Sequence, residues 1–444
     1  MRFFLFILLG LIALPAFAQA PVQTPYEALA QDATEYVKEF NVTPDEAMRR
    51  LVAQQSSVPA TDALAKGYAD RLAGIYIDHD GTYRITILLT GTDPVPDRTI
   101  TAGGLIIPVT FRTGAQATRS QIIAAIAAHQ AEIRAALTGP PGMGVDARTG
   151  SLVIMVRPSD ASKQGAQSLA QKFASLTGVP VEIRTFNGVD KNLSLDGGGR
   201  LVGLNPESGK RNLCTAGFVV TDGTEDALTT AAHCPDGLSS IESDKEEVPL
   251  KMVGAWGAAY QDVQIHSAAE PMAPFFLVDK KRTLARPVAS WRNRDSTRVG
   301  DYVCHRGERT GYSCATVEFV DYAPPGDLCA GPCTPTWVAV NGPDCGKGDS
   351  GGPVFSGMIA FGLMKGASNS SDDTCRLYYY MSVDYLPPGW RIAYERQPYQ
   401  AASVLTVKSD PSTIAASSQR KPGSQGDKSA LETHETRAFA GVTK

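Results

Sequence analysis

The sequence predicts a domain of β-strands in its second half and a smaller α+β region before it. From about Gly197, short β-branched runs alternate with Gly, Pro, Asn and Asp, a pattern typical of an all-β barrel or sandwich. Before that point, helical spacing and single strands alternate. All eight cysteines lie between Cys214 and Cys375, so the two parts also differ in composition. At about 150 residues per domain, 444 residues allow about three domains.

The chain begins with the pattern of an export signal. Met1 and Arg2 precede an apolar run, FFLFILLGLIALP, and the small residues AFAQA, so we expect a signal peptide over residues 1–20, cleaved after Ala18 or Ala20. The alternative is an uncleaved membrane anchor, but the run is short for a membrane span. An even number of cysteines in an exported chain indicates disulfides. We therefore expect a secreted or periplasmic protein without a stable membrane anchor.

Residues 21–195 are expected to form the α+β region. Apolar residues at helical spacing predict a helix over 26–40. Residues 43–46 read TPDE, which predicts a capping box that opens a second helix ending near Gln55. Two small α+β units follow, with strands expected at 82–90, 105–111, 151–157 and 181–185, and helices at 119–137 and 161–176.

Residues 196–395 are expected to form the β domain, with helical periodicity nearly absent until about Asp384. The last residues, 396–444, are rich in Ser, Ala, Lys and Gln with few aromatics, which predicts a disordered tail. The net charge is −4 and charged residues make up 20% of the chain. This composition offers no basic field for nucleic acid, which we exclude as a partner.

Residues 346–353 read GKGDSGGP and carry the strongest chemical signal in the chain. A serine hydroxyl becomes an effective nucleophile when a base takes its proton and a tight turn presents it. The glycines around Ser350 permit such a turn, and they leave the amides of Gly348 and Ser350 free to bind an oxyanion. The alternative is a glycine-rich turn with an incidental serine.

A base and a carboxylate to orient it are found upstream. His233 lies in TTAAHC directly before a cysteine, where small neighbours and an adjacent disulfide would fix its ring beside a cleft. Asp262 lies in YQDVQIH, where strand alternation places Asp262, Gln264 and His266 on one face. A buried carboxylate holds a histidine in the productive tautomer. The alternative for Asp262 is a solvated position on the strand.

The order of the three groups along the chain separates the known arrangements. His233, Asp262 and Ser350 follow the order of chymotrypsin-like enzymes, which differs from that of subtilisins and α/β-hydrolases. TAAHC, the Asp262 strand and GDSGGP resemble the chymotrypsin-fold serine proteases. CTAGFVV from Cys214, VCHRGERTGYSC around Cys304 and FGLMKG are similar to segments of the bacterial branch typified by alpha-lytic protease and the streptogrisins.

The resemblance covers most of residues 26–395, and it implies a fold and a partner. The fold would be an all-β double β-barrel (chymotrypsin-like) protease domain preceded by an α+β pro-region. In this family the pro-region, here residues 21–195, acts as folding aid and inhibitor of its own protease. The implied catalytic residues are His233, Asp262 and Ser350, with the oxyanion held by Gly348 and Ser350.

The resemblance also implies a disulfide pairing, which the sequence alone leaves open among 105 connectivities. The implied pairs are Cys214–Cys234, Cys304–Cys314 and Cys345–Cys375, with Cys329–Cys333 remaining as a local bridge. A metal site at Cys329 and Cys333 would lack companion ligands. We therefore expect no metal and no organic cofactor.

The chain departs from the family pattern in three places. There is no I-V-G-G start; residues 198–202, GGRLV, are the nearest counterpart, so processing is expected near residues 186–200. The aspartate before the nucleophile, Asp349, is expected to pair with His305 or Arg306. Lys365 stands where the family usually has a serine near the catalytic aspartate.

The substrate pocket is expected to be walled by Asp344, Met364, Lys365 and Gly366. Met364 favours a small apolar side chain before the cut, whereas Lys347 with Lys365 would favour an acidic one. We expect a weak preference for small or apolar residues.

The sequence thus predicts a secreted serine endopeptidase, monomeric and made as a zymogen, that acts on polypeptides. One rival is a catalytically silent, protease-like binding module, which would need a missing triad member. Another is an esterase or transferase that uses the same acyl-enzyme chemistry, and turnover of esters rather than peptides would reveal it.

Overall fold

The computed structural model describes residues 21–185, 188–192, 199–204, 209–241, 247–269, 272–326, 328–370 and 374–394. The expected signal peptide and the expected tail over residues 396–444 lie outside the described residues. So does most of the expected processing region.

The described chain begins with three helices, α1 (Pro25–Phe40), α2 (Pro44–Ser56) and α3 (Val58–Gly67). A reciprocal capping box opens α1, between Thr24 and Glu27. The box expected at α2 is only half formed: the Thr43 hydroxyl accepts from the amide of Glu46, but the Glu46 carboxylate binds the arginines of the next turn instead. The sequence predicts helices over residues 21–78 as a whole; α3 lies in this span without predicted bounds of its own, and residues 72–78 form a strand instead.

Two small α+β units follow, and the helix expected in the first unit, at 119–137, packs on the sheet of the second. The first is a four-stranded sheet of order β1-β2-β4-β3, with β1 (Leu72–Asp78), β2 (Arg84–Thr90), β3 (Arg98–Ala102) and β4 (Leu105–Ala115). The second has β5 (Gly142–Asp146), β6 (Ser151–Val156) and β7 (Val181–Thr185), with α4 (Arg119–Ala135), α5 (Pro158–Gln164) and α6 (Ala166–Thr177). The single helix expected over 161–176 is wrong, because Gly165, at φ +79°, divides it into α5 and α6.

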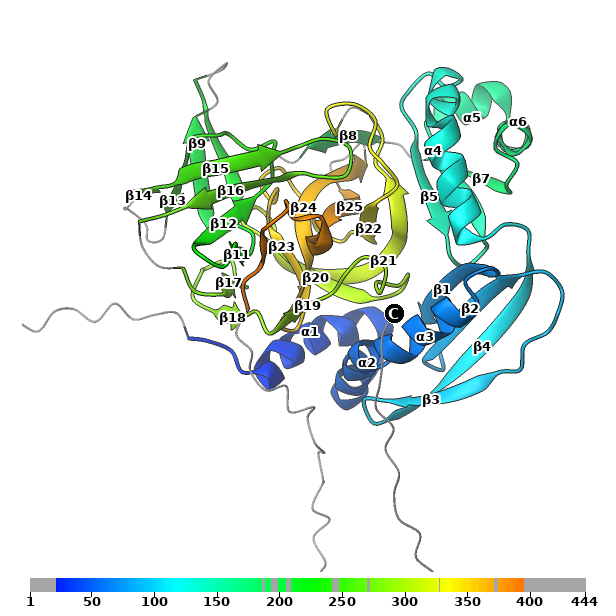
Figure 1. The fold of residues 1–444 in the computed structure, drawn as a ribbon, viewed down its shortest axis with the longest axis horizontal. Helices are drawn as coiled ribbons and strands as arrows, with labels where there is room; N and C mark the ends of the chain where they lie inside the picture. Colours follow the sequence, from blue (N-terminus) through cyan, green and yellow to red (C-terminus); the bar gives the residue numbers. More distant parts are fainter. Residues whose placement is uncertain are drawn as a thin grey trace, which may run out of the picture. The chain divides into compact units, whose positions relative to one another are not determined.

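A closed barrel of six strands forms the C-terminal part of the β domain (Figure 1). Its strands are β20 (Tyr302–Gly307), β23 (Pro353–Ser356), β24 (Ile359–Ser370), β25 (Cys375–Ser382), β22 (Trp337–Asn341) and β21 (Gly311–Ala323), in this order around the ring. Pairing of β20 with β21 closes the ring, and a buried cluster including Val303, Val317, Phe361 and Met364 fills it.

The N-terminal part of the β domain consists of two antiparallel sheets. One has the order β10-β9-β13-β14, with β9 (Arg200–Leu204), β10 (Arg211–Thr215), β13 (Leu238–Ile241) and β14 (Glu247–Pro249). The other has the order β15-β16-β12-β11-β26, with β11 (Val219–Thr221), β12 (Asp226–Thr230), β15 (Lys251–Trp256), β16 (Val263–Ser267) and β26 (Arg391–Ile392). A buried cluster around the Cys214–Cys234 bridge joins the two sheets.

Short elements complete the β domain. The strands β17 (Phe275–Leu277) and β18 (Ala285–Pro287) pair with each other, β19 (Ser290–Trp291) runs parallel to β24, and η1 (Val383–Tyr385) is a single 3₁₀ turn. The four disulfides are the pairs that the family resemblance implied: Cys214–Cys234, Cys304–Cys314, Cys329–Cys333 and Cys345–Cys375.

Strand pairing joins the α+β region to the β domain at two places. β5 pairs antiparallel with the end of β21, so the second small sheet continues into the closed barrel. A further strand, β8 (Gly188–Asn192), pairs antiparallel with β24 over residues 366–370. The region before residue 193 therefore adds one strand beside β21 and another beside β24 of the β domain.

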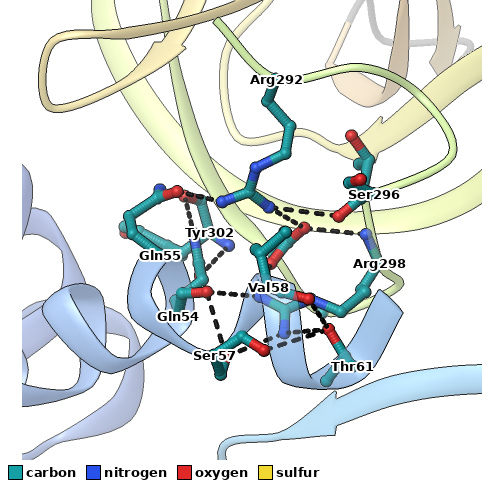
Figure 2. A network of polar contacts seen from close by, with 12 residues as sticks. Gln54, Gln55, Ser57, Val58, Thr61, Arg292, Ser296, Arg298 and Tyr302 are labelled. Atoms are coloured by element: carbon teal, nitrogen blue, oxygen red, sulfur yellow. Dashed lines mark hydrogen bonds and ion pairs between the residues drawn. The ribbon is translucent and has the colours of Figure 1, made fainter. Parts of the chain in front are cut away.

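The first helices contact the β domain through buried polar groups as well. Arg298 donates to the carbonyl of Gln54, and Arg292 donates to the side chain of Gln55 (Figure 2). Gln54 in turn exchanges two hydrogen bonds with the backbone of Tyr302, at 3.1 and 2.6 Å. Since these groups are buried, each one depends on its partner across the contact.

Candidate active site

The three groups predicted to carry the chemistry lie in one hydrogen-bonded chain. His233 Nε2 is 2.8 Å from Ser350 Oγ, and His233 Nδ1 is 2.7 Å from Asp262 Oδ2. The backbone amide of His233 donates to the other oxygen, Asp262 Oδ1, at 3.2 Å. The side chain of His233 is 14% exposed and that of Asp262 is 2% exposed, so a substrate can reach the imidazole but not the carboxylate.

Each group comes from a different part of the β domain. His233 follows β12, Asp262 directly precedes β16, and β12 and β16 are paired neighbours. Gln264 and His266 hydrogen-bond to each other at 2.8 Å, as expected for residues on one face of the strand. The nucleophile Ser350 lies in the closed barrel, in the turn before β23, so the site is formed where the two parts of the domain meet.

Hydrogen bonds between those two parts fix the serine against the histidine. The amide of Thr215 donates to the carbonyl of Ser350 at 2.8 Å, and its hydroxyl donates to the carbonyl of Gly348, also at 2.8 Å. Thr230, three residues before His233, donates to the carbonyl of Thr215 at 2.7 Å. Gly351 has φ +81°, and a Cβ there would collide with the Thr230 hydroxyl, so glycine is required for this approach.

Two backbone amides of the turn around Ser350 are candidates for binding an oxyanion. Gly348 adopts φ +117°, a conformation that L side chains rarely take. Among the described residues, no acceptor faces the amide of Gly348 or that of Ser350. This is the arrangement that an oxyanion hole requires, because the donors must be available when charge develops on the substrate oxygen.

The buried carboxylate of Asp349 holds this turn, but with partners other than those expected. It accepts from the Thr310 hydroxyl at 2.8 Å, from the amide of Thr310 at 3.2 Å and from the amide of Arg309 at 3.0 Å. It also accepts from the amide of Gly346 at 2.8 Å. Burial raises its pKa, and these hydrogen bonds act in the opposite direction.

Neither His305 nor Arg306 therefore pairs with Asp349 within the described residues. Arg306 donates instead to Glu308 and to the carbonyl of Asp279. His305 is fully buried, and burial lowers its pKa to about 3, which keeps the ring neutral. Thr310 was missed because it lies in the turn between β20 and β21, and no local signal in the sequence connects that turn with Asp349.

The residues predicted to wall the pocket do not all lie together. Asp344 is exposed beside Cys345, whereas the side chain of Met364 is buried in the core of the closed barrel. The backbone of Met364 bonds to Gly351 and Gly352, which ties β24 to the nucleophile turn. Gly366 pairs with Asn192 of β8 on one side and with Tyr379 of β25 on the other.

Lys365 lies beside the carboxylate of Asp262. Its Nζ is 3.1 Å from Asp262 Oδ2, and both side chains are buried. Burial raises the pKa of Asp262, but His233 and Lys365 outweigh it, so the net pKa lies below the usual range. The family resemblance implied that this lysine stands near the aspartate, but it did not imply an ion pair.

One cluster has the composition of a metal site. Asp32, Cys304 and Cys314 bring potential ligand atoms close together. The two cysteines form a disulfide, and Asp32 pairs with Arg286 at 2.8 Å. Since a metal needs free thiolates, this cluster does not fit one.

The closed barrel, the two flanking sheets and the placement of the triad between them define the chymotrypsin-like fold. No protein-family model and no curated protein matches the chain. Solved structures do match. Thermobifida fusca Protease A (TFPA) is 18% identical over 45% of this chain and 98% of its own, with a TM-score of 0.35. Nocardiopsis Protease (NAPase) is 20% identical over 45% of this chain and 98% of its own, also with a TM-score of 0.35.

A glutamic acid specific serine protease is 25% identical over 42% of this chain and 93% of its own, with a TM-score of 0.34. These similarities cover less than half of this chain. The function is therefore argued from the geometry of the site. Within the described residues, no helix is long and apolar enough to cross a membrane. The four disulfides are typical of a protein that folds in an oxidising compartment.

Proposed function

We propose that this protein is a secreted serine endopeptidase made as a zymogen. The observation that carries the proposal is the continuous chain of hydrogen bonds from Asp262 through His233 to Ser350. The carboxylate fixes the tautomer in which Nδ1 carries the proton, which leaves Nε2 free to accept the proton of the serine hydroxyl.

Each step of the proposed reaction uses one of these groups. Ser350 Oγ attacks the peptide carbonyl carbon while His233 Nε2 takes its proton, and the amides of Gly348 and Ser350 bind the resulting oxyanion. His233 then gives that proton to the leaving amine as the C–N bond breaks. Water attacks the acyl-enzyme, its proton passes to His233 and then to Ser350 Oγ, and the free acid departs.

The zymogen part of the proposal is supported by the strand β8. An extended peptide commonly binds a protease or another receptor by adding a strand to an exposed sheet edge. The segment that directly follows Lys365 offers such an edge, and residues 188–192 of this chain pair with it antiparallel. A substrate needing the same edge would compete with β8, so we propose residues 21–195 as folding aid and inhibitor in cis.

Preference for a small or apolar residue before the cut remains part of the proposal. Met364 no longer supports this preference, because its side chain is buried in the barrel core, but Gly366 adds no side chain where β24 pairs with β8. Lys365 is turned to Asp262 and is engaged there, which removes one of the two lysines that would favour an acidic residue.

A fluorophosphonate probe tests the proposal directly. The full precursor is expressed with export, and the exported protein is treated with the probe beside a Ser350→Ala control. We expect a labelled band of the size of residues 196–395, with or without the tail, that is absent from the control. A folded and processed wild-type protein without label would contradict the hydrolase and favour the binding module. Label confined to the uncut chain would support the hydrolase but contradict its synthesis as a zymogen. Turnover of esters but not of peptides would favour the esterase.

A further inference from the structure

One oxygen of the Asp262 carboxylate has two nitrogen partners, the imidazole of His233 and the ammonium of Lys365. Asp262 Oδ2 accepts from His233 Nδ1 at 2.7 Å and from Lys365 Nζ at 3.1 Å, whereas Oδ1 accepts only the backbone amide of His233 among the described residues. The lysine thus contacts the same atom through which the carboxylate acts on the imidazole.

The lysine is held in this place from several sides. Its side chain is 1% exposed, and Nζ lies 5.0 Å from the centroid of the Trp337 ring, in cation–π contact. Trp337 is itself fully buried on β22, and its Nε1 donates to the carbonyl of Ala259 at 3.2 Å. A buried ammonium so placed cannot turn to solvent without leaving the carboxylate.

Among the described residues, the remaining hydrogen-bond partner of Asp262 from another strand is uncharged. From β25, Met381 Sδ accepts the amide of Asp262 at 3.3 Å. The charges that act on the carboxylate are those of His233, after β12, and Lys365, on β24. The electrostatics of the triad therefore depend on these two partners.

The position of Lys365 has a consequence for the base. In a triad, the negative carboxylate stabilises the imidazolium that forms during catalysis. A positive charge on the same oxygen offsets part of that stabilisation, so the imidazole gives up its proton more readily. Neutral imidazole is the form that can accept the serine proton, and more of it is then present in acid.

We propose that Lys365 is a positioning residue that sets the acid limit of catalysis: by neutralising Asp262 it keeps His233 in the base form at lower pH. The inference depends on the proposed function, because it assumes that His233 is the general base. In this proposal Asp262 still holds the tautomer of His233, and Lys365 determines how much of the negative charge of Asp262 acts on the imidazole.

The test is the pH profile of kcat/KM on a peptide substrate, from pH 4 to 9, for the exported and processed enzyme. Lys365→Met removes the charge and keeps most of the volume, and Lys365→Arg retains the charge. Lys251→Met is the matched control, because it removes one exposed positive charge from the same domain. For Lys365→Met we expect the acid limb to move to higher pH by about one unit, because a charge close to a titrating group shifts its titration by about that much. KM should change little. Lys365→Arg and Lys251→Met should keep the wild-type limb.

The outcomes separate the two proposals. An active wild type whose Lys365→Met variant keeps the wild-type acid limb overturns this inference alone, as does an equal shift in Lys251→Met. If the wild-type protein shows no Ser350-dependent hydrolysis, both the proposed function and this inference are overturned. If Lys365→Met does not accumulate, Lys365→Ser serves in its place, because a hydroxyl beside the carboxylate leaves it a donor, and the same shift is expected.

Discussion

Buried aspartates show how the surroundings of one residue type determine what it does. Asp262 faces a histidine and a lysine, and in the proposed mechanism its charge acts on His233 as the base. Asp349 faces amides and a hydroxyl, and it holds the turn that contains Ser350. Asp32 of α1 faces Arg286, at 2.8 Å, and it joins the first helix to the β domain. All three are buried; in the proposed mechanism the first acts in the chemistry, whereas the other two hold the turn around Ser350 and the first helix in place.

The Asp32 contact allows a stability prediction for a single residue. Asp32 also accepts from the hydroxyl of Tyr312 and the amide of Gly357, both at 2.6 Å. Asp32→Ala leaves the fully buried Arg286 without its counter-charge, so we expect the free energy of unfolding to fall by about 3–5 kcal/mol. Urea unfolding of the Ser350→Ala precursor, which cannot process itself, measures the change.

The control is Glu35→Ala, on the same helix. Glu35 pairs with Lys38 at the surface, so the loss should stay below about 1 kcal/mol. Equal effects of the two substitutions would show that the Asp32 contact contributes no more than a surface pair.

Residues of the site differ in how far the sequence alone can place them. GDSGGP and TAAHC are local motifs, so the residues that shape the backbone around Ser350 and His233 are neighbours in the sequence and can be recognised there. Thr310, in the turn between β20 and β21, and Trp337, on β22, touch Asp349 and Lys365 only because the barrel closes. Their contacts depend on strand register, which local patterns do not encode.

Elements were predicted well where a strong local signal begins or ends them. The helix at 26–40 agrees with α1, and the strand at 181–185 agrees with β7. β5 was missed because its sequence, GMGVD, contains two glycines and little β propensity. It is a strand because β6 and β21 pair with its two edges, which is a tertiary cause.

The glycines of β5 lead to a prediction about this element. A Cβ on Gly142 would collide with the hydroxyl of Tyr322 on β21. Gly142→Val should therefore prevent β5 from pairing with β21. If the α+β region aids folding, the yield of exported, probe-labelled enzyme should then fall at least about tenfold, which corresponds to a loss of 1.4 kcal/mol. Gly67→Ala is the control, because no atom lies within 4 Å of a Cβ there. A normal yield from Gly142→Val would show that the β5–β21 pairing is not needed for folding.

Three buried histidines determine how the whole molecule responds to acid. Burial lowers the pKa of His79 and of His266 to about 4, and that of His305 to about 3. In the unfolded chain these rings titrate near their ordinary value, about 6.5. Between the two values the unfolded state binds more protons, so stability is full above about pH 6.5 and decreases as the pH falls toward 4.

The expected slope is up to about 4 kcal/mol per pH unit between pH 5 and 6, from about 1.4 kcal/mol for each histidine. Urea unfolding of the Ser350→Ala precursor over this interval measures the slope. In His305→Phe, which fills the same buried site without a titrating group, the slope should be about one third smaller. An unchanged slope in this variant would mean that His305 is not kept neutral by the fold.

The placement of the disulfides has a consequence for the chain once it is cut. Every bridge joins two cysteines of the β domain, and none reaches the α+β region. While the backbone is continuous, each part meets the other at a high effective concentration fixed by the tether. After a single cut near residues 186–200, the association becomes bimolecular, and its extent depends on the amount of protein present. Dilution on leaving the cell would then itself favour the free enzyme, with no further event in the molecule.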